Sequence, residues 1–384
     1  MKRLLSLCLA CALMMPCALA APAQDSPAGA LALSAASGVL MEKETGQLLY
    51  EQHAHQQLEP ASVTKIMTLL LILEAIDSGR ISKEDMVSVS AYAAGMGGSQ
   101  VYLKEGEQMT VGELIKCITV VSGNDAAVAM AEYLAGSESA FVTEMNRKAA
   151  QLGMEDTTFL NCTGLPIQGH LTSAHDIALM SRELILNHPG IRDYTTIWMD
   201  SIRDGAFGLT NTNRLVRFYP GATGLKTGST DGAMYCMSAT AERNGMELIA
   251  VIMKSPTSAQ RFEDAKALLE HGFANYTLAQ VYPEVPIPPI PVLLGEVEQV
   301  QPTPSRSCSL LVRKGEENLI TTRLNLPTNV EAPVEPGQTL GELEVLVDGQ
   351  PRETIPLTTA EGVARLTIPG IFLRLLRQMT MAAP

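Results

Sequence analysis

The sequence predicts an α+β fold: an antiparallel sheet flanked by helices with an all-helical subdomain, then a small β-sandwich domain and a C-terminal amphipathic helix. Two observations predict the first domain. Pairs of apolar strands lie near both ends of residues 35–276, and the segment between them is mostly helical in periodicity. This order favours an antiparallel sheet over a doubly wound parallel one. A third observation, short alternating runs after a Pro-rich stretch, predicts the second domain.

The domain predicted for residues 35–276 begins with two strands within residues 37–52, joined at Thr45-Gly46. A later hairpin pairs residues 233–241 with 247–254 around Asn244-Gly245. Capping residues and 3.6-residue periodicity predict helices over residues 62–78, 111–121, 125–134, 139–152, 174–186 and 261–276. Residues 80–110 and 205–228 are rich in turn-forming residues, so no long element is expected there.

The C-terminal part changes composition near Val281. Residues 277–294 are rich in proline and predict a stiff linker. Residues 295–368 predict the β-sandwich domain. In the tail, residues 369–384, a helix would place Ile371, Phe372, Leu375, Leu376 and Met379 on one face, with Arg374, Arg377 and Gln378 opposite. Such a helix is too short to span a bilayer but suits a membrane surface; the alternative is a helix docked on the β-sandwich.

The N-terminus is typical of an exported protein. Lys2 and Arg3 precede a short apolar stretch, and Ala18-Leu19-Ala20 fits a cleavage site, so residues 1–20 predict a signal peptide. The alternative is an uncleaved anchor. Residues 21–34, rich in Ala, Pro and Ser, predict a flexible leader.

Composition excludes some classes of function. The net charge of −13 argues against a nucleic-acid partner. The four cysteines beyond the signal peptide show no metal spacing, and their three possible disulfide pairings are not distinguished: Cys117, Cys162, Cys236 and Cys308. Cys117 is in phase with Leu114 and Ile118, as a core residue of a helix would be. The six histidines show no metal or catalytic spacing.

Ser62 and Lys65 are the most informative pair in the chain. If the run Pro60-Ala61-Ser62-Val63-Thr64-Lys65 opens a helix, positions three apart share one face. A neutral amine beside a serine hydroxyl can take its proton, and a helix N-terminus favours the negative charge that develops. The pair therefore predicts a nucleophile with its base.

Three other places supply candidate partners. Ser122 and Asn124 flank Gly123 in a break between two helices, although Ser and Asn also serve as simple helix caps. Lys226, Thr227, Gly228 and Ser229 offer an ammonium, hydroxyls and a close backbone approach for an anionic ligand; the alternative is a surface turn. The guanidinium of Arg261 suits a carboxylate, unless it is solvated at a helix start.

Together and in this order, Ser-x-x-Lys, Ser-x-Asn and Lys-Thr-Gly resemble the active-site set of penicillin-binding proteins and serine β-lactamases. More narrowly, the segments around these motifs look like those of the serine-type D-alanyl-D-alanine carboxypeptidases, the low-molecular-mass penicillin-binding proteins: 60–65, 122–126 and 223–228. The run Asn161-Cys162-Thr163-Gly164-Leu165-Pro166 is similar to a loop of that family. The resemblance covers nearly the whole chain.

The resemblance implies removal of the terminal D-alanine from peptidoglycan stem peptides ending in D-Ala-D-Ala, through an acyl-Ser62 intermediate that β-lactams also form. Lys65 would be the base, Ser122 would pass a proton to the leaving group, and Asn124 would orient Lys65 and the substrate. Lys226, Thr227 and Arg261 would hold the terminal carboxylate, and the backbone N–H groups of Ser62 and Ser229 would form the oxyanion hole. The implied reaction needs no metal or cofactor. The implied location is the outer face of the bacterial cytoplasmic membrane, in the periplasm or cell-wall space.

Two alternatives follow from the same motifs. A class A β-lactamase shares two of them but carries Ser-Asp-Asn where this chain has Ser122-Gly123-Asn124, and the spacing of Glu155 does not match its catalytic glutamate. The other is a catalytically silent wall-binding protein. The sequence does not separate a carboxypeptidase from an endopeptidase, and it indicates neither the third stem-peptide residue nor the oligomeric state.

Overall fold

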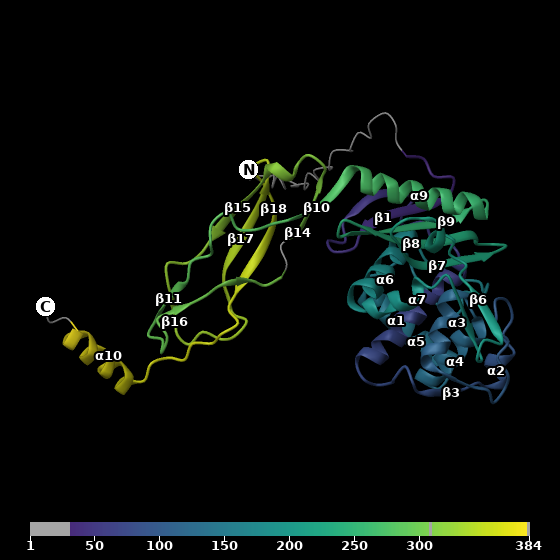
Figure 1. Cartoon of the computed structure of the whole chain (residues 1–384), viewed down its shortest axis with the longest axis horizontal. Coiled ribbons are helices and arrows are strands. Elements are labelled where there is room, and N and C mark those ends of the chain that lie inside the picture. The colour runs from purple at the N-terminus through teal and green to yellow at the C-terminus, as the bar shows by residue number, and fades with distance from the viewer. Residues whose placement is uncertain (1–30, 307–308, 382–384) are drawn as a thin grey trace, which may run out of the picture. The chain divides into compact units, whose positions relative to one another are not determined.

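The computed structural model describes residues 31–306 and 309–381. The predicted signal peptide, residues 21–30 of the leader, Cys308 and the last three residues lie outside this described part. The described part holds an α+β region and a β-rich region, which are taken in turn (Figure 1).

The α+β region is built on a five-stranded antiparallel sheet with strand order β2-β1-β9-β8-β7. Its strands are β1 (Ser37–Glu42), β2 (Leu48–Gln52), β7 (Ala222–Thr230), β8 (Met234–Arg243) and β9 (Met246–Ser255). Nine of the ten residues of β9 are buried, as expected for a central strand covered on both faces. Asn244 and Gly245 both have positive φ, which is the turn chemistry of a tight hairpin, so the predicted β8–β9 hairpin is confirmed.

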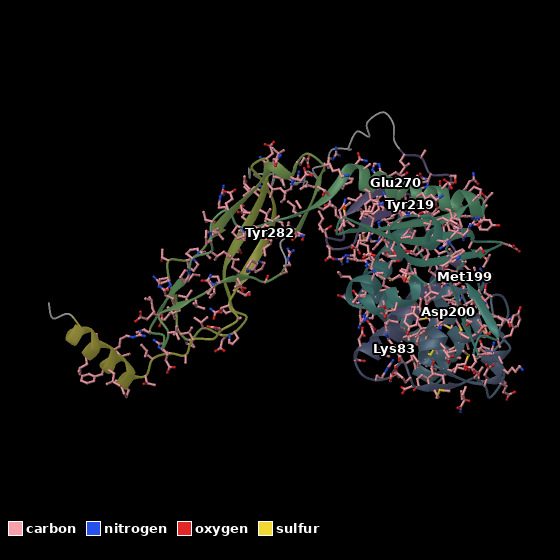
Figure 2. The ribbon with its side chains drawn as sticks, in the orientation of Figure 1. Lys83, Met199, Asp200, Tyr219, Glu270 and Tyr282 are labelled. Carbon is pink, nitrogen blue, oxygen red and sulfur yellow. The ribbon has the colours of Figure 1, made fainter. Side chains whose placement is uncertain are left out.

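Helices cover both faces of this sheet (Figure 1). α9 (Ser258–Asn275) packs on one face against β9 and β8, and α6 (Ala174–Asn187) packs on the other against β9 and β1. α9 approaches closely at Gly272, where a Cβ atom would lie 2.4 Å from Leu248 Cδ1. At the rim of the sheet, Tyr219 donates to Glu270 Oε1 at 2.8 Å (Figure 2).

The helical subdomain lies beyond α6 and buries most of the apolar core. Its longer helices are α1 (Lys65–Asp77), α3 (Val111–Val120), α4 (Asn124–Ala135) and α5 (Glu138–Gln151). Thr110 and Glu113 form a capping box that starts α3, and Gly136 ends α4 with positive φ. Cys117 is fully buried in α3, as its phase with Leu114 predicts.

Shorter elements connect these helices and strands. They are η1 (Ala61–Thr64), β3 (Met86–Ser88), α2 (Ala91–Ala94), β4 (Gln108–Thr110), η2 (Pro189–Ile191), α7 (Arg192–Thr195), β5 (Met199–Ile202), β6 (Phe207–Thr210) and α8 (Leu215–Phe218). η1 corrects one expectation, since the helix predicted from Ser62 begins only at Lys65, after a 3₁₀ turn. Ala61, the first residue of this turn, has φ of 49°, in the left-handed region that an α-helix does not include.

β7 corrects a second expectation, because residues 205–228 were predicted to be rich in turns. The end of this segment belongs to an edge strand paired with β8, which runs from Ala222 to Thr230. Gly224 and Gly228 lower the strand propensity of the segment, and only its pairing with β8 reveals it as a strand.

The β-rich region contains three small sheets. One sheet pairs β10 (Tyr276–Gln280) with β14 (Ser309–Arg313), and a second joins β11 (Ile290–Leu293) to β12 (Gln299–Val300) and β16 (Val330–Glu331). The third contains β13 (Thr303–Pro304), β15 (Ile320–Asn325), β17 (Thr339–Val347) and β18 (Gln350–Thr358). The 3₁₀ helix η3 spans Glu317–Leu319. Two buried clusters, centred on Leu343 and Ile290, supply its core. The predicted linker over residues 277–294 is therefore partly structured, since β11 and most of β10 lie within it.

The last element of the described part is α10 (Ile368–Met381), where the amphipathic tail was predicted. Among the described residues, no helix is both long and apolar enough to cross a membrane. The side chains of Arg377, Gln378 and Met379 are not among those that the structure describes.

Candidate active site

Ser62 and Lys65 lie where η1 passes into α1, beside the edge strand β7. Ser62 is the second residue of η1, and Lys65 is the first residue of α1. Lys65 Nζ lies 3.0 Å from Ser62 Oγ, so the contact predicted from their spacing is present. Lys65 is fully buried.

The Lys65 amine has two further contacts, both with atoms that only accept hydrogen bonds. It donates to Asn124 Oδ1 at 2.6 Å and to the backbone carbonyl of Thr163 at 2.7 Å. A neutral amine has two N–H groups and one lone pair, and these two acceptors use both N–H groups. The lone pair then remains for the Ser62 hydroxyl.

Burial lowers the pKa of the Lys65 amine from 10.5 to about 7. Cys162 and Asp125 act in the opposite direction, but their effect is smaller than the cost of burying the charge. Asp125 is itself occupied by the backbone, since its carboxylate accepts from the N–H groups of Val101, Leu103 and Ala126. A large fraction of Lys65 is therefore neutral near pH 7.

Ser122 lies in the break between α3 and α4, and Asn124 is the first residue of α4, but neither caps a helix through its side chain. The N-cap of α4 is Gly123, without a side-chain hydrogen bond, so the capping alternative is wrong. Asn124 Nδ2 donates to the Gly97 carbonyl at 2.6 Å, which holds Oδ1 toward Lys65. Ser122 has φ of 64° and is 4 % exposed, and its Oγ has no hydrogen-bond partner among the described residues. That hydroxyl is available to a bound molecule.

The Lys226–Ser229 run lies on β7, so the surface-turn alternative is also wrong. A Cβ atom on Gly228 would lie 2.8 Å from the backbone nitrogen of Ser62, and glycine therefore permits β7 to pass directly along the Ser62 turn. Thr227 Oγ1 donates to Thr212 Oγ1 at 2.7 Å, and Ser229 is exposed.

Lys226 is a second buried amine at this site. Its Nζ donates to the Thr227 carbonyl at 2.9 Å. Burial is the main cause that lowers its pKa well below 10.5, and the positive charges of Lys65 and Arg261 add to the effect. Lys65, Lys226 and Arg261 are therefore close enough to act on one another electrostatically, and the positive charge among them favours binding of an anionic group.

Arg261 is buried in the first turns of α9, so it is not the solvated residue of the alternative interpretation. Its Nη1 donates to the backbone carbonyls of Gly228, at 3.2 Å, and Cys236, at 3.3 Å. Burial lowers its pKa to about 10, and its Nε has no partner among the described residues. The guanidinium thus lies under the strand that carries the Lys-Thr-Gly run.

Sequence reasoning missed two parts of the site that depend on long-range contacts. One is the carbonyl of Thr163; its loop was noted only through the family resemblance. The other is His170, which is 2 % exposed and bonds through Nε2 to Thr64 Oγ1 at 2.9 Å. Thr64 in turn donates to the Ala61 carbonyl, so His170 supports the turn that carries Ser62. Burial lowers the pKa of His170 to about 4.

Comparison with known proteins identifies the family of this chain. Residues 22–257 match the family described as D-alanyl-D-alanine carboxypeptidase, and residues 284–365 match the penicillin-binding protein 5 C-terminal domain. The D-alanyl-D-alanine carboxypeptidase DacF of Bacillus subtilis is 41 % identical over 372 residues, which are 95 % of each chain. DacC of Escherichia coli is 32 % identical over 353 residues, covering 89 % of this chain and 87 % of that protein. This chain belongs to the D-alanyl-D-alanine carboxypeptidase family.

Solved structures show the same fold. Penicillin-binding protein 5 from Haemophilus influenzae superposes with a TM-score of 0.77 at 29 % identity, covering 88 % of this chain and 100 % of that one. Penicillin-binding protein 6B from Escherichia coli gives a TM-score of 0.72 at 32 % identity, over 88 % and 99 %. The fold class and the family that the sequence predicts are confirmed.

Proposed function

We propose that this protein is a serine D-Ala-D-Ala carboxypeptidase, which removes the terminal D-alanine from peptidoglycan stem pentapeptides through an acyl-Ser62 intermediate. The single observation that carries this proposal is the 3.0 Å contact between Ser62 Oγ and a buried amine whose N–H groups both face other acceptors. Membership of the family supports the substrate class.

Acylation begins with the Ser62 hydroxyl. Its oxygen attacks the carbonyl between the two D-alanines while its proton passes to the lone pair of neutral Lys65. Backbone N–H groups of Ser62 and Ser229 stabilise the oxyanion, and the close approach of β7 to the Ser62 turn at Gly228 supports this arrangement. Asn124 keeps the amine of Lys65 oriented toward Ser62.

Release of D-alanine requires a proton on its nitrogen. The Ser122 hydroxyl passes that proton from Lys65 to the leaving nitrogen, and its buried, unpartnered Oγ supports this role. Water then attacks the acyl ester, which regenerates Ser62 and releases the shortened peptide.

The terminal carboxylate of the substrate is held near Lys226, Thr227 and Arg261. Two buried cations close to the edge strand provide the attraction, because a charge in a poorly solvated site is weakly screened. β-Lactams occupy the same place and acylate Ser62. A related penicillin-binding protein from Listeria monocytogenes, 34 % identical, has been solved in its ampicillin-bound form.

The test uses the purified full chain with a diacetyl-Lys-D-Ala-D-Ala tripeptide and with a labelled penicillin. Ser62→Ala is compared with Ser78→Ala, which makes the same change at the C-cap of α1, where the Ser78 hydroxyl donates to the Ala75 carbonyl. We expect D-alanine release and one covalent label in the wild type and in Ser78→Ala. In Ser62→Ala the covalent label does not form, and the rate of D-alanine release is at least about a thousandfold lower.

Two outcomes would overturn the proposal. Rapid penicillin turnover without a lasting label would indicate a β-lactamase, although Glu155 is exposed and its spacing does not fit that role. A folded wild-type protein that neither takes the label nor releases D-alanine would indicate a silent wall-binding protein.

We further propose that the protein acts outside the cytoplasmic membrane, on peptidoglycan, and touches the membrane surface through α10. Large apolar side chains of α10 support this: Ile368, Phe372, Leu373 and Leu375 are exposed by 84, 63, 66 and 55 %. Each apolar side chain that enters the interface contributes about 1.5–3 kcal/mol.

Sedimentation with vesicles of phosphatidylglycerol and phosphatidylethanolamine tests this contact. The double variant Phe372→Glu/Leu375→Glu is compared with Leu319→Glu, which places a charge on an exposed leucine of η3. We expect the double variant to lose vesicle binding by more than about tenfold, because each substitution removes that apolar contribution. Equal sedimentation of all three proteins would contradict a role for α10.

A further inference from the structure

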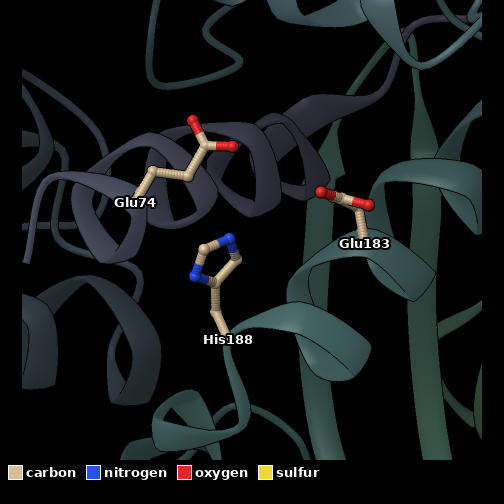
Figure 3. A group of neighbouring side chains, drawn as sticks. All are labelled: Glu74, Glu183 and His188. Atoms are coloured by element: carbon tan, nitrogen blue, oxygen red, sulfur yellow. The ribbon is translucent and has the colours of Figure 1, made fainter. Parts of the chain in front are cut away.

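A cluster of metal-ligating side chains lies away from the active site, where the last turns of α1 and α6 come together. Glu74 belongs to α1, Glu183 to α6, and His188 is the C-cap residue of α6. Each offers one ligand atom, and these atoms all lie within 4.8 Å of one another. Figure 3 shows the His188 ring directed between the two carboxylates.

Each member of the cluster has one polar atom held by a neighbour and another left over. His188 Nδ1 lies 2.5 Å from Asp77 Oδ2, Glu183 Oε2 accepts from Asn187 at 2.9 Å, and Glu74 Oε1 pairs with Lys148. Because a carboxylate only accepts, Asp77 places the proton on Nδ1 and leaves a lone pair on Nε2. A carboxylate behind the imidazole is the usual support of a metal-bound histidine.

We propose that Glu74, Glu183 and His188 Nε2 bind a divalent cation of the zinc type, with solvent completing the coordination. Two carboxylates and one imidazole form a ligand set that zinc accepts. Bond lengths of about 2.0–2.2 Å require the ligand atoms to move closer by about 1 Å, which glutamate side chains accomplish by rotation. His188 is 9 % exposed, whereas 28 % of the Glu74 side chain is exposed, so a cation reaches the site from solvent.

The charge of the surroundings favours a cation. Three carboxylates, Glu74, Glu183 and Asp77, meet at the cluster, against one ammonium, Lys148, so carboxylate charge predominates among these contacts. Lys148 competes with the cation for Glu74. Removal of the Lys148 ammonium therefore strengthens cation binding if the cluster binds a cation. If the cluster consists of ion pairs alone, the same change only weakens the cluster.

The bound cation would fasten α1 to α6. α1 carries Lys65 at its other end, nine residues before Glu74, which is about 13 Å along a helix. The cation is therefore too far from Ser62 to take part in the chemistry. Its effect is on the stability of the helical subdomain, so the site is separate from the proposed function.

The test is titration of the chelated full chain with Zn²⁺ alone, by calorimetry and by thermal unfolding. His188→Gln and Glu183→Gln remove ligands, Asp77→Asn removes the support, and Lys148→Gln removes the competitor. His55→Gln is the control, because His55 and His175 stack 4.5 Å apart beside Asp156 and offer Zn²⁺ an exposed alternative. Penicillin labelling verifies that each variant is folded.

We expect the wild type and His55→Gln to bind one Zn²⁺ at this site and to unfold at a higher temperature with it. Asp77→Asn binds about 10–100-fold more weakly, Lys148→Gln binds more tightly, and both ligand variants lose the thermal shift. Equal Zn²⁺ binding by the wild type and by folded Glu183→Gln would overturn the proposal. So would a thermal shift that disappears in His55→Gln, or weaker binding by Lys148→Gln.

Discussion

Substitution of Asn124 by aspartate tests whether neutral Lys65 is the base. Asn124 Oδ1 lies 2.6 Å from Lys65 Nζ, so Asn124→Asp places a carboxylate against the amine with almost no change in shape. An opposite charge at this distance raises the pKa of a lysine by about 1–3 units. The pKa of Lys65 is then raised from about 7.

The size of the effect follows from the neutral fraction. With a pKa of about 7, about half of Lys65 is neutral at pH 7, whereas an ordinary lysine with a pKa of 10.5 would be neutral in about one molecule in 3,000. Asn124→Asp lowers the neutral fraction at pH 7 by about 5- to 500-fold. Acylation by penicillin falls by the same factor at pH 7, and part of the rate returns at higher pH.

The assay is the second-order rate of labelling by a fluorescent penicillin from pH 5.5 to 9.5. The wild-type rate should rise about tenfold per pH unit below pH 6 and level off above pH 8. Asn187→Asp is the control, since Asn187 is exposed at the end of α6. A wild-type rate that does not change with pH, or an Asn124→Asp profile with an unshifted midpoint, would refute the role of Lys65.

Three further predictions follow from contacts of single residues. His170 has a pKa of about 4 in the folded protein and about 6.5 in the unfolded chain, so the unfolded state binds more protons between these pH values. The free energy of unfolding should therefore fall by up to about 3 kcal/mol as the pH drops from 6.5 to 4. In urea unfolding, the free energy of His170→Asn should depend less steeply on pH than that of the wild type. Gly228→Ala places a Cβ atom 2.8 Å from Ser62 N, so penicillin labelling should slow by about 100-fold, and an unchanged rate would contradict this packing. Gly272→Ala forces a Cβ atom against Leu248 Cδ1, and should cost about 1–3 kcal/mol in unfolding free energy without reducing labelling of the folded fraction.

The sequence predicts the parts of the site that depend on local spacing. Ser62 and Lys65 are three residues apart, and both a 3₁₀ turn and an α-helix bring such positions together, so an error in the start of α1 left the contact intact. The longer helices were predicted to within a few residues because capping residues and buried faces mark them, whereas the one-turn helices α2, α7 and α8 were not predicted.

The sequence does not predict the parts that depend on pairing across long separations. β7 has two glycines and gains its strand conformation from β8. The role of the Thr163 backbone carbonyl has no signature in the sequence, because every residue has a backbone carbonyl. Glu74 and His188 belong to different helices, so no short spacing reveals that they meet.

The turn that carries Ser62 is enclosed by two glycines from distant parts of the chain. Gly228 of β7 lies against Ser62 N, and a Cβ atom on Gly164 would overlap the Ala61 carbonyl at 1.8 Å. The nucleophile is therefore in place only after both the edge of the sheet and the loop after α5 have closed on this turn. Since such non-local contacts form late in folding, reactivity toward penicillin should appear together with the fully folded enzyme and not in partly folded chains. Covalent labelling by the antibiotic is thus also a direct count of correctly folded molecules.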